Sequence, residues 1–452
     1  MPVSPARAAA FDILLRVERE SSYASELLHS AACQRLSVSD HALVTELVMG
    51  VLRWRSRLDD EIAGATSQPI AKLDVEILIA LRLAHYQFRW LDRIPQRAAL
   101  YESVELVKRA RKRSAAPFVN AVLRKLTAGP LEREVLPDDQ DDSPETLARF
   151  FAHPVWLVER WARQYGMSAA RQICSQDQSI PATAIRLRTS DAAAQLNQEG
   201  ITLAPGGLLA SARRVEAGDI TQTHGYRTGQ MVIQDEASQL IAALVGCGLR
   251  IGTRILDCCA APGGKTLAIA DRNPGVSITA VELHPHRARL LRKLLDAADS
   301  GEQVQVIVGD ARQLPTSLRF DRVLADVPCS GTGTLARNPE IKWRLAIADL
   351  AALQQRQSAI LRSALAQLAP GGCLIYSTCS LEKEENEDVI EQALAEDNSF
   401  RLLDCRAELD RLKASGELIW PDPTSLTRGP YLRTIPGFHP CDGFFAAILE
   451  RA

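Results

Sequence analysis

The chain has 452 residues, a formal net charge of −2 and an apolar fraction of 46%. This length exceeds what one ordinary core needs, so two or three domains are expected. No apolar run reaches membrane-spanning length and the N-terminus lacks a signal-peptide pattern, which favours a cytoplasmic protein without a membrane partner. The ten cysteines are scattered, with no pair or Cys/His cluster at zinc spacing, so the sequence predicts neither a disulfide framework nor a metal site.

Residues 1–130 are predicted to form an all-α bundle. Apolar residues recur at helical spacing in four stretches, namely Ala8–Val17, Leu43–Leu52, Val75–Leu83 and Val104–Leu126. Ser39-Asp40 predicts the start of the second helix, and Gly50 predicts a weak point within it or near its end. Amphipathic helices with short connections are typical of bundles.

Charge is unevenly distributed along the chain. Basic residues cluster near the end of the bundle, at Lys108, Arg109, Arg111, Lys112, Arg113, Arg124 and Lys125. Such a run is either a solvated helix face or a contact for nucleic acid, and charge alone leaves both open. Acids crowd the segment 132–145, and Gly129-Pro130 stops the helices, so residues 131–144 are predicted to be a linker.

Two further parts follow the linker. Residues 145–235 are predicted to be a small α+β module, because a helical pattern at Val155–Tyr165 precedes a strand-like alternation at Ile185–Thr189 and a turn-rich stretch. From residue 236 to 452, helices and strands alternate as in a Rossmann-like, doubly wound parallel sheet of the α/β class. The predicted strands are Arg254–Cys258, Ser277–Val281, Val304–Val308, Arg322–Asp326, Cys373–Ser377 and Phe444–Leu449. The helices between them include Arg287–Ala298 and Asp349–Leu368.

The first of these strands is followed by a loop of small residues that opens a helix, Cys259-Ala260-Ala261-Pro262-Gly263-Gly264-Lys265. Small residues let a ligand approach the backbone closely, and a helix N-terminus offers free N–H groups. Only two residues separate Pro262 from Lys265, so the loop is neither a Gly-x-Gly-x-x-Gly nor a Walker motif. A phosphate cradle is therefore the weaker interpretation.

Acids end the next two predicted strands. Glu282 can accept hydrogen bonds from both hydroxyls of an adenosine ribose, and Asp310, which follows Gly309, suits the adenine amino group. Each acid alone could equally be a surface or turn residue. A small-residue loop and two acids at three successive strand ends fit S-adenosylmethionine better than NAD.

Two cysteines follow later strands, in Pro328-Cys329-Ser330-Gly331 and in Ser377-Thr378-Cys379-Ser380. One strand-end cysteine is more often structural, whereas two in one sheet favour chemistry. A thiolate that adds to carbon 6 of cytosine makes carbon 5 enamine-like, so that carbon 5 can attack a sulfonium methyl group; the carbon 5 proton then leaves and the thiolate is eliminated. A cation such as Lys265 could raise the thiolate fraction, and Asp326 could hydrogen-bond the cytosine ring.

At these residues the chain resembles the RNA (cytosine-5) methyltransferases of the NOP2/Sun family, from about Gln234 to the C-terminus. The shared motifs are Asp257-x-Cys259-Ala260-Ala261-Pro262-Gly263-Gly264-Lys265-Thr266, Asp326-Val327-Pro328-Cys329-Ser330-Gly331-Thr332-Gly333 and Ser377-Thr378-Cys379-Ser380. The resemblance implies that Cys379 is the nucleophile, that Cys329 assists release of the methylated base, and that Asp326 acts with them. It also implies cofactor contacts at Cys259, Ala260, Ala261, Pro262, Gly263, Gly264, Lys265, Glu282, Asp310 and Asp326. Two departures are mild: the family more often has alanine at Val327, and aspartate is also common at Glu282.

The N-terminal bundle resembles the NusB-like RNA-binding domain in Tyr23–Leu28, Asp40–Val48 and Gly50–Arg53. Joined to such a methyltransferase core, it implies that the partner is the 16S ribosomal RNA of the small subunit rather than DNA. Two alternatives stay open: the same chemistry on transfer RNA, and a non-catalytic RNA-binding ribosome assembly factor, against which Asp326, Cys329 and Cys379 argue. The lack of an obvious association helix favours a monomer.

A last motif, Gly437-Phe438-His439-Pro440-Cys441-Asp442-Gly443, precedes the final predicted strand. We interpret it as a turn that the fold requires, although His439 and Asp442 could line the edge of the pocket.

Overall fold

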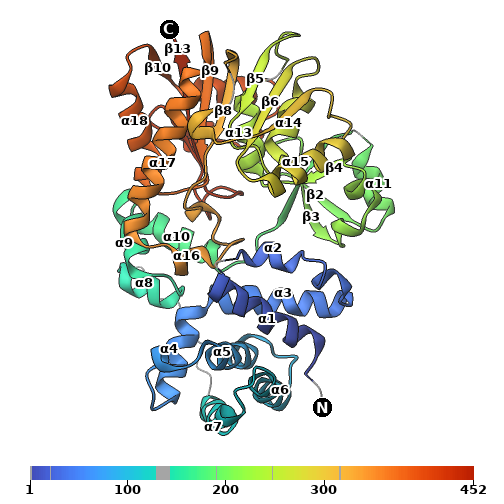
Figure 1. Cartoon of the computed structure of the whole chain (residues 1–452), viewed down its shortest axis with the longest axis vertical. Helices are drawn as coiled ribbons and strands as arrows, with labels where there is room; N and C mark the ends of the chain where they lie inside the picture. Colours follow the sequence, from blue (N-terminus) through green and yellow to red (C-terminus); the bar gives the residue numbers. More distant parts are fainter. Residues whose placement is uncertain (1–2, 21, 129–142, 190, 247, 315–316) are drawn as a thin grey trace. The chain divides into compact units, whose positions relative to one another are not determined.

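The computed structural model describes residues 3–20, 22–128, 143–189, 191–246, 248–314 and 317–452 (Figure 1). The chain forms two compact units: Met1–Ile180 together with Leu335–Arg344, and Pro181–Thr334 together with Leu345–Ala452. Most of the predicted linker at 131–144 lies outside the described residues, and its last residue, Pro144, begins a helix. None of the helices built from described residues is long and apolar enough to span a bilayer.

The first unit is helical. Its bundle consists of α1 (Pro5–Glu20), α2 (Ala24–Leu28), α3 (Val38–Arg53), α4 (Arg55–Ala65), α5 (Val75–Trp90), α6 (Gln96–Arg109) and α7 (Ala116–Thr127). Each helix turns an apolar face to a shared core, and α5 is buried along most of its length, so it lies at the centre of the bundle. The predicted all-α bundle is confirmed.

The structure adds local detail to the predictions for the bundle. Helix α3 begins at Val38, before the predicted Ser39-Asp40, because the Ser37 hydroxyl caps it by accepting a hydrogen bond from the Asp40 N–H (3.1 Å). Helix α3 continues through Gly50 to Arg53, and the weak point predicted at Gly50 stays a prediction. A Cβ at Gly50 would lie 2.0 Å from the Tyr86 ring, so glycine lets α3 and α5 approach. The stretch 104–126 forms two helices, because the chain turns between α6 and α7 through Arg111, whose φ is 62°.

The first unit also contains α8 (Pro144–Phe150), α9 (Val155–Tyr165), α10 (Met167–Asp177) and α16 (Ile341–Arg344). The segment around α16 comes from a distant part of the sequence, and hydrogen bonds attach it to the bundle. Glu340 accepts from the Ala24 N–H (2.8 Å), and Arg344 donates to the Val17 carbonyl (2.8 Å). The sequence did not predict this attachment. The three domains predicted at 1–130, 145–235 and 236–452 stay a prediction, and the two compact units divide the chain at different places.

The second unit begins with a four-stranded antiparallel sheet in the order β2-β3-β1-β4. Its strands are β1 (Thr183–Leu187), β2 (Thr202–Pro205), β3 (Ala212–Ala217) and β4 (Met231–Ile233), and its helices are α11 (Ala192–Gln198) and α12 (His224–Arg227). Buried Ile185, Leu196 and Met231 belong to its core. The strand predicted at Ile185–Thr189 is therefore present as β1, two residues earlier.

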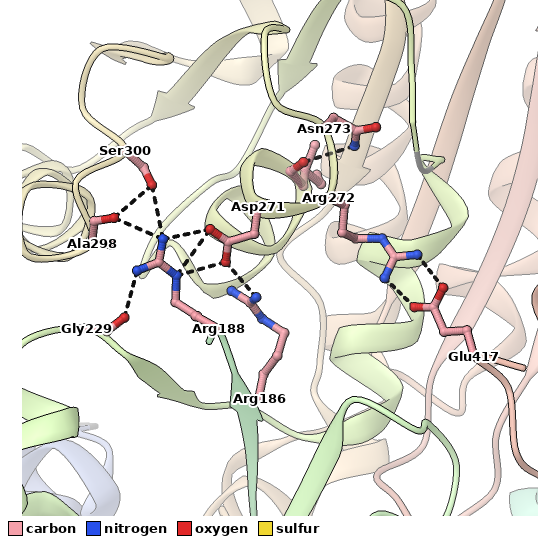
Figure 2. Close-up of polar contacts among 10 residues, drawn as sticks. Arg186, Arg188, Gly229, Asp271, Arg272, Asn273, Ala298, Ser300 and Glu417 are labelled. Carbon is pink, nitrogen blue, oxygen red and sulfur yellow. Dashed lines mark hydrogen bonds and ion pairs between the residues drawn. The ribbon is translucent and has the colours of Figure 1, made fainter. Parts of the chain in front are cut away.

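An ionic anchor fixes this small sheet to the rest of the second unit, as Figure 2 shows. Asp271, on α14 (Gly264–Arg272), accepts from Arg186 (2.6 Å) and from Arg188 (2.7 Å), which lie on β1 and just after it. Arg188 also donates to the carbonyls of Gly229 (2.7 Å) and Ala298 (2.9 Å). The small sheet is thus held by directed bonds as well as by packing.

The second sheet has nine strands. Its order is β11-β12-β13-β9-β8-β5-β6-β7, with β10 paired to β13. The strands are β5 (Arg254–Asp257), β6 (Ser277–Glu282), β7 (Val304–Val308), β8 (Phe320–Asp326), β9 (Leu368–Thr378), β10 (Phe400–Leu403), β11 (Thr427–Arg428), β12 (Tyr431–Arg433) and β13 (Phe445–Arg451). Strands β5 to β9 pair in parallel, and the Rossmann-like arrangement is confirmed.

The expectation of a wholly parallel sheet was wrong for its last strand. Strand β13 is antiparallel to β9, with Phe445 opposite Thr378. It enters from β12 by an antiparallel pairing rather than through a crossover helix. The loop that precedes β13 therefore lies at the same edge of the sheet as the end of β9.

Helices cover both faces of this sheet. On one face α13 (Glu236–Leu244), α14, α15 (Pro285–Ala297) and α19 (Cys405–Ala414) share a core with Ile255 of β5. On the other face α17 (Ile347–Ala366) and α18 (Glu387–Glu396) share a core with Leu256 (Figure 1). Neighbouring residues of β5 thus point into different cores, as expected for a strand buried on both faces.

Candidate active site

The carboxyl end of β5 leads into the predicted small-residue loop. The Cys258 and Ala260 N–H groups donate to the carbonyls of Leu324 and Val281 (2.9 Å each), which ties the loop to both neighbouring strands. Gly263 has a φ of 114°, and a Cβ there would lie 2.5 Å from Leu291. Only glycine fits this position, and the chain then enters α14 directly.

Asp257 ends β5 and is fully buried. Its Oδ2 accepts a hydrogen bond from the Thr266 hydroxyl (2.7 Å). Burial raises the pKa of Asp257 to about 7, although the bond from Thr266 acts in the opposite direction. The hydrogen bond therefore ties the end of β5 to the first turn of α14.

The two predicted cofactor acids lie at the same edge. Glu282 ends β6 and is only 5% exposed, and one of its oxygens accepts from the His284 N–H (2.8 Å). Asp310 follows β7, which pairs with β6, and is more exposed. Hydrogen bonds from Arg312, the nearest being 2.6 Å long, lower the pKa of Asp310. Both carboxylates thus lie beside the loop, and both oxygens of Asp310 accept hydrogen bonds from Arg312.

This donor set fits S-adenosylmethionine. A buried carboxylate at the end of the second parallel strand can accept from ribose hydroxyls. The loop before α14 carries no bulky side chain, and the first turn of a helix leaves its N–H groups unbonded within the helix. The residues predicted from the sequence are therefore brought to one edge of the sheet.

The structure brings the two predicted cysteines together. The Sγ atoms of Cys329 and Cys379 are 3.3 Å apart. Strands β8 and β9 place Asp326 opposite Ser377, so the loops that follow them run side by side. The hydrogen bond with Cys379 and the burial of the site raise the pKa of Cys329. The two sulfur atoms can therefore share one proton in a hydrogen bond.

Asp326 and Lys265 form an ion pair beside these cysteines. The Lys265 Nζ is 2.7 Å from one oxygen of Asp326, and the Ser377 hydroxyl donates to the other oxygen at 2.7 Å. Burial alone would lower the pKa of Lys265, but attraction to Asp326 and a smaller contribution from Cys379 raise it. Lys265 is therefore charged and bound to Asp326, so it can act on the thiol only through space.

Sequence reasoning missed one central residue, Glu385. It lies at the end of the short helix η8 (Lys383–Glu385), is fully buried, and accepts hydrogen bonds from the residues that follow both cysteines. Its surroundings in the sequence, Glu382 to Glu387, resemble a solvated acidic run. Only its distance of six residues from Cys379 could have drawn attention to it.

His439 and Asp442 are both buried in the loop before β13. The Nδ1 atom of His439 accepts from the Ile435 N–H (2.9 Å), and burial lowers the pKa of His439 to about 4, so its ring is neutral at pH 7. The Asp442 N–H donates to Asp235 (3.1 Å). The neighbouring Gly443 N–H donates to the carbonyl of Gly333 (2.8 Å), so this loop supports the one that carries Cys329. A place for His439 and Asp442 at the edge of the pocket stays a prediction.

The basic cluster of the first unit is partly neutralised. Three of its members form ion pairs with acids of the same unit, Lys108 with Glu105, Arg109 with Asp12 and Lys112 with Asp74. Arg113 and Arg124 are exposed. A nucleic-acid contact at this cluster stays a prediction.

The fold and the site define the class of protein: a Rossmann-like methyltransferase that uses S-adenosylmethionine. The family described as 16S rRNA methyltransferase RsmB/F matches residues 249–450, the NusB family matches residues 4–128, and the ferredoxin-like domain of the RsmF/B-like methyltransferases matches residues 153–219.

Two relatives match nearly the whole chain. Ribosomal RNA small subunit methyltransferase B of Vibrio cholerae is 33% identical over 98% of this chain and 97% of its own. The protein of the same name from Pseudomonas syringae is 31% identical over 99% of this chain and 97% of its own. The chain therefore belongs to the RsmB/F family of methyltransferases.

Solved structures agree on the fold. The crystal structure of PH0851 covers 100% of this chain and 99% of its own with a TM-score of 0.81 and 23% identity. A methyltransferase homolog from Pyrococcus horikoshii covers 68% of this chain and 98% of its own, with a TM-score of 0.55 and 25% identity.

Proposed function

We propose that this protein methylates carbon 5 of a cytosine in 16S ribosomal RNA through a covalent bond between Cys379 and the base. The observation that supports this most directly is the pair of sulfur atoms 3.3 Å apart beside the Lys265–Asp326 ion pair. A nucleophile, a second thiol and a hydrogen-bonding carboxylate lie together at the edge that suits the cofactor.

The chain's own groups account for each step. The Cys379 thiolate adds to carbon 6 of cytosine, which makes carbon 5 nucleophilic. Asp326 hydrogen-bonds the ring and stabilises the adduct. After carbon 5 is methylated, the carbon 5 proton leaves to water, and its bonding electrons re-form the double bond between carbons 5 and 6 as the carbon 6–sulfur bond breaks and returns the thiolate of Cys379. Cys329 assists this release of the methylated base.

The cofactor contacts are proposed for the residues predicted from the sequence. The loop from Cys259 to Lys265 borders the cofactor, Glu282 holds the ribose, Asp310 contacts the adenine, and Asp326 lies at the reacting end. When bound, S-adenosylmethionine supplies an electrophilic methyl group. Cys259 serves only as a small neutral thiol, because burial and then the carboxylates of Asp257 and Asp326 raise its pKa.

The choice of ribosomal RNA rests on two findings. Relatives from Vibrio cholerae and Pseudomonas syringae that match nearly the whole length are named for the small ribosomal subunit, and the helical bundle matches the NusB family. If the bundle contacts phosphates, affinity for RNA should fall steeply as salt is added. An affinity that does not change with salt would count against this role of the bundle.

The decisive experiment compares the intact protein with Cys379→Ala, using labelled S-adenosylmethionine and unmodified small-subunit ribosomal RNA. Label should appear on carbon 5 of cytosine with the intact protein and be absent with the variant. Cys373→Ala, on the strand β9 that leads to Cys379, is the matched control and should keep the activity. Label that persists in Cys379→Ala would refute the assignment of the nucleophile, and label found only on transfer RNA would overturn the substrate.

A further inference from the structure

Helix α15 carries a row of cations on its solvent side. Arg287, Arg289 and Lys293 are exposed, and none of them forms an ion pair with a residue that the structure describes. Arg289 and Lys293 are four residues apart, so they lie on the same side of the helix. Arg292 is exposed as well and donates a hydrogen bond to the Val306 carbonyl (3.0 Å). The outer side of α15 is therefore strongly positive.

The charges of α15 are placed where they weaken the helix. The aligned peptide dipoles of a helix leave partial positive charge at its N-terminus and partial negative charge at its C-terminus. Arg287 lies in the first turn and Asp296 in the last turn, so each meets a partial charge of its own sign. Arg289 and Lys293 also repel each other at their four-residue spacing. Helix stability thus gives no reason for this arrangement.

The basic cluster at the end of the bundle is different in this respect. Lys108 and Arg109 lie in the last turn of α6, where the helix dipole favours cations. Each also has an acidic partner, Glu105 for Lys108 and Asp12 for Arg109. These two cations stabilise their own unit, whereas those of α15 have neither kind of support from the described residues.

The inner side of α15 places the helix beside the candidate site. Its buried residues include Leu291, and a Cβ at Gly263 would lie 2.5 Å from that side chain, so α15 packs on the small-residue loop. The helix begins at Pro285, three residues after Glu282, the acid that ends β6. The cations therefore lie on the outside of the helix that backs the proposed cofactor loop.

Exposed basic and aromatic residues continue onto the small sheet module. A Cβ at Gly229 would lie 2.9 Å from the carbonyl oxygen of Ala297, so the end of α12 meets the end of α15. Helix α12 carries exposed Tyr226 and Arg227. Arg227 donates to the Gln222 carbonyl (3.0 Å) and forms no ion pair with a described residue. One continuous part of the second unit thus presents several cations and an aromatic ring.

We propose that this α15 surface binds the phosphate backbone of the RNA substrate. The surface consists of Arg287, Arg289 and Lys293 of α15 and Arg227 of α12. Exposed cations without acidic partners attract phosphates, and their binding releases the counterions that the nucleic acid holds. Tyr226, which is 42% exposed, offers a ring on which an unpaired base can stack. The proposal rests on the proposed function, because RNA is the substrate of the methyl transfer.

A lipid surface fits these residues less well than RNA does. Helices that lie on membranes insert an apolar face, with cations on the opposite side. The apolar face of α15 is buried in the core of the second unit, and among its large apolar side chains only Leu290 is exposed. The helix therefore offers charge to a partner and little apolar area, which matches a nucleic-acid backbone.

The test is the double variant Arg289→Gln/Lys293→Gln in the full chain. Binding to unmodified small-subunit ribosomal RNA is measured at several salt concentrations, without S-adenosylmethionine. The slope of log affinity against log salt should become shallower by about 1.4–1.8, because each lost phosphate contact removes about 0.7–0.9. Affinity near about 0.1 M salt should fall by about tenfold or more. An unchanged slope would overturn the proposal.

The matched control is the double variant Arg362→Gln/Arg401→Gln. It removes the same charge from two exposed arginines of the second unit that are paired with acids, Glu396 and Glu450. The slope should change by less than about 0.5 in this control. A fall equal to that of the α15 variant would show that net charge alone sets the affinity, and it would overturn the assignment of the surface.

Two further measurements separate surface contact from packing. The KM for S-adenosylmethionine should stay the same in Arg289→Gln/Lys293→Gln, and the unfolding free energy in urea should stay the same or rise, since a repulsion is removed. A rise in that KM together with the loss of RNA affinity would mean that the variant acts through the cofactor loop, against the proposal. Arg227→Gln should lower the slope by about 0.7–0.9, and no change would overturn the extension to α12.

The outcomes also distinguish this surface from the proposed function. If the intact protein methylates RNA and the α15 variant keeps the full slope, the surface fails alone. If the intact protein binds RNA through these cations but transfers no methyl group to cytosine, the proposed function fails and the surface stands. Loss of binding to phosphatidylglycerol vesicles in the variant, with RNA binding unchanged, would assign the surface to lipid and overturn the proposal.

Discussion

Cysteines follow both β5 and β9, and the charges around them differ. At the β5 end, burial and the carboxylates of Asp257 and Asp326 raise the pKa of Cys259, so it stays a thiol. At the β9 end, Cys379 has the ammonium of Lys265 among its neighbours and the Cys329 thiol at 3.3 Å. The comparison teaches that two cysteines at strand ends can differ in the sign of the charge beside them, and this charge is one of the factors that control how readily a thiol ionises.

Removal of the second thiol should produce the largest effect at the β9 end. In Cys329→Ala the adduct forms but is not released, so turnover should fall by about 10²–10⁴ and a covalent protein–RNA complex should accumulate. A denaturing gel would show it as a shifted band. Cys259→Ala is the comparison from the β5 end and should give no such band, and a band there would break the distinction between the two ends.

Lys265→Met tests whether the ammonium distinguishes the two ends. It removes the partner of Asp326 and the cation near Cys379, so kcat should fall by about 10²–10³. Alkylation of Cys379 by iodoacetamide should slow in the same variant. If kcat falls but the alkylation rate does not change, Lys265 acts on Asp326 alone.

Asp257→Asn tests the buried carboxyl at the β5 end through pH. The folded pKa is about 7, whereas an unfolded aspartate has a pKa of about 3.9. Between these values the unfolded chain loses the proton while the folded chain keeps it, so stability from this group is present at low pH and is lost as pH rises to 7.

Asparagine has no proton to lose. Relative to the intact protein, Asp257→Asn should therefore gain roughly 3–4 kcal/mol between pH 4 and pH 7.5, three units at 1.36 kcal/mol each. Urea unfolding of both proteins across this range measures the gain. A difference that is the same at every pH would show that Asp257 is ionised in the fold.

A carboxylate away from both ends should affect stability without this pH signature. Asp271→Ala leaves the buried Arg186 and the largely buried Arg188 without their shared partner (Figure 2) and should cost about 3 kcal/mol in unfolding free energy. Glu417→Ala breaks an ion pair with a single arginine, Arg272, which lies next to Asp271 on α14. This variant should lose less unfolding free energy, about 1–2 kcal/mol. Equal losses in the two variants would mean that the second arginine bound to Asp271 adds nothing to the stability of the fold.

Much of the fold follows from local patterns. The alternation of helix and strand predicted most ends of strands β5 to β9 to within a few residues. This works because a strand buried on both faces needs a continuous apolar run and a turn after it. The same logic placed Cys329, Cys379, Glu282 and Asp310 at one edge, since the carboxyl ends of parallel strands meet there.

Other features depend on contacts that no local pattern contains. The packing role of Gly50 depends on Tyr86, which occupies the space beside it, and β13 reads as one more parallel strand until its pairing with β9 shows the opposite direction. The segment 335–344 joins the helical unit through hydrogen bonds to residues about three hundred positions away.

By itself the sequence determined the domain types and the strand-end motifs, and it supplied the reacting groups that we propose, because these depend on residue spacing and side-chain chemistry. Only the tertiary structure decided which carboxylates in an acidic run are buried, with Glu382 and Glu385 inside and Glu384 partly exposed. Glu385 differs from Glu384 and Glu387 through its contacts with Ser330 and Gln357, which lie 55 and 28 residues away. The energy of a buried charge depends on donors that the fold gathers from distant parts of the chain, and their positions are not encoded near the charge itself.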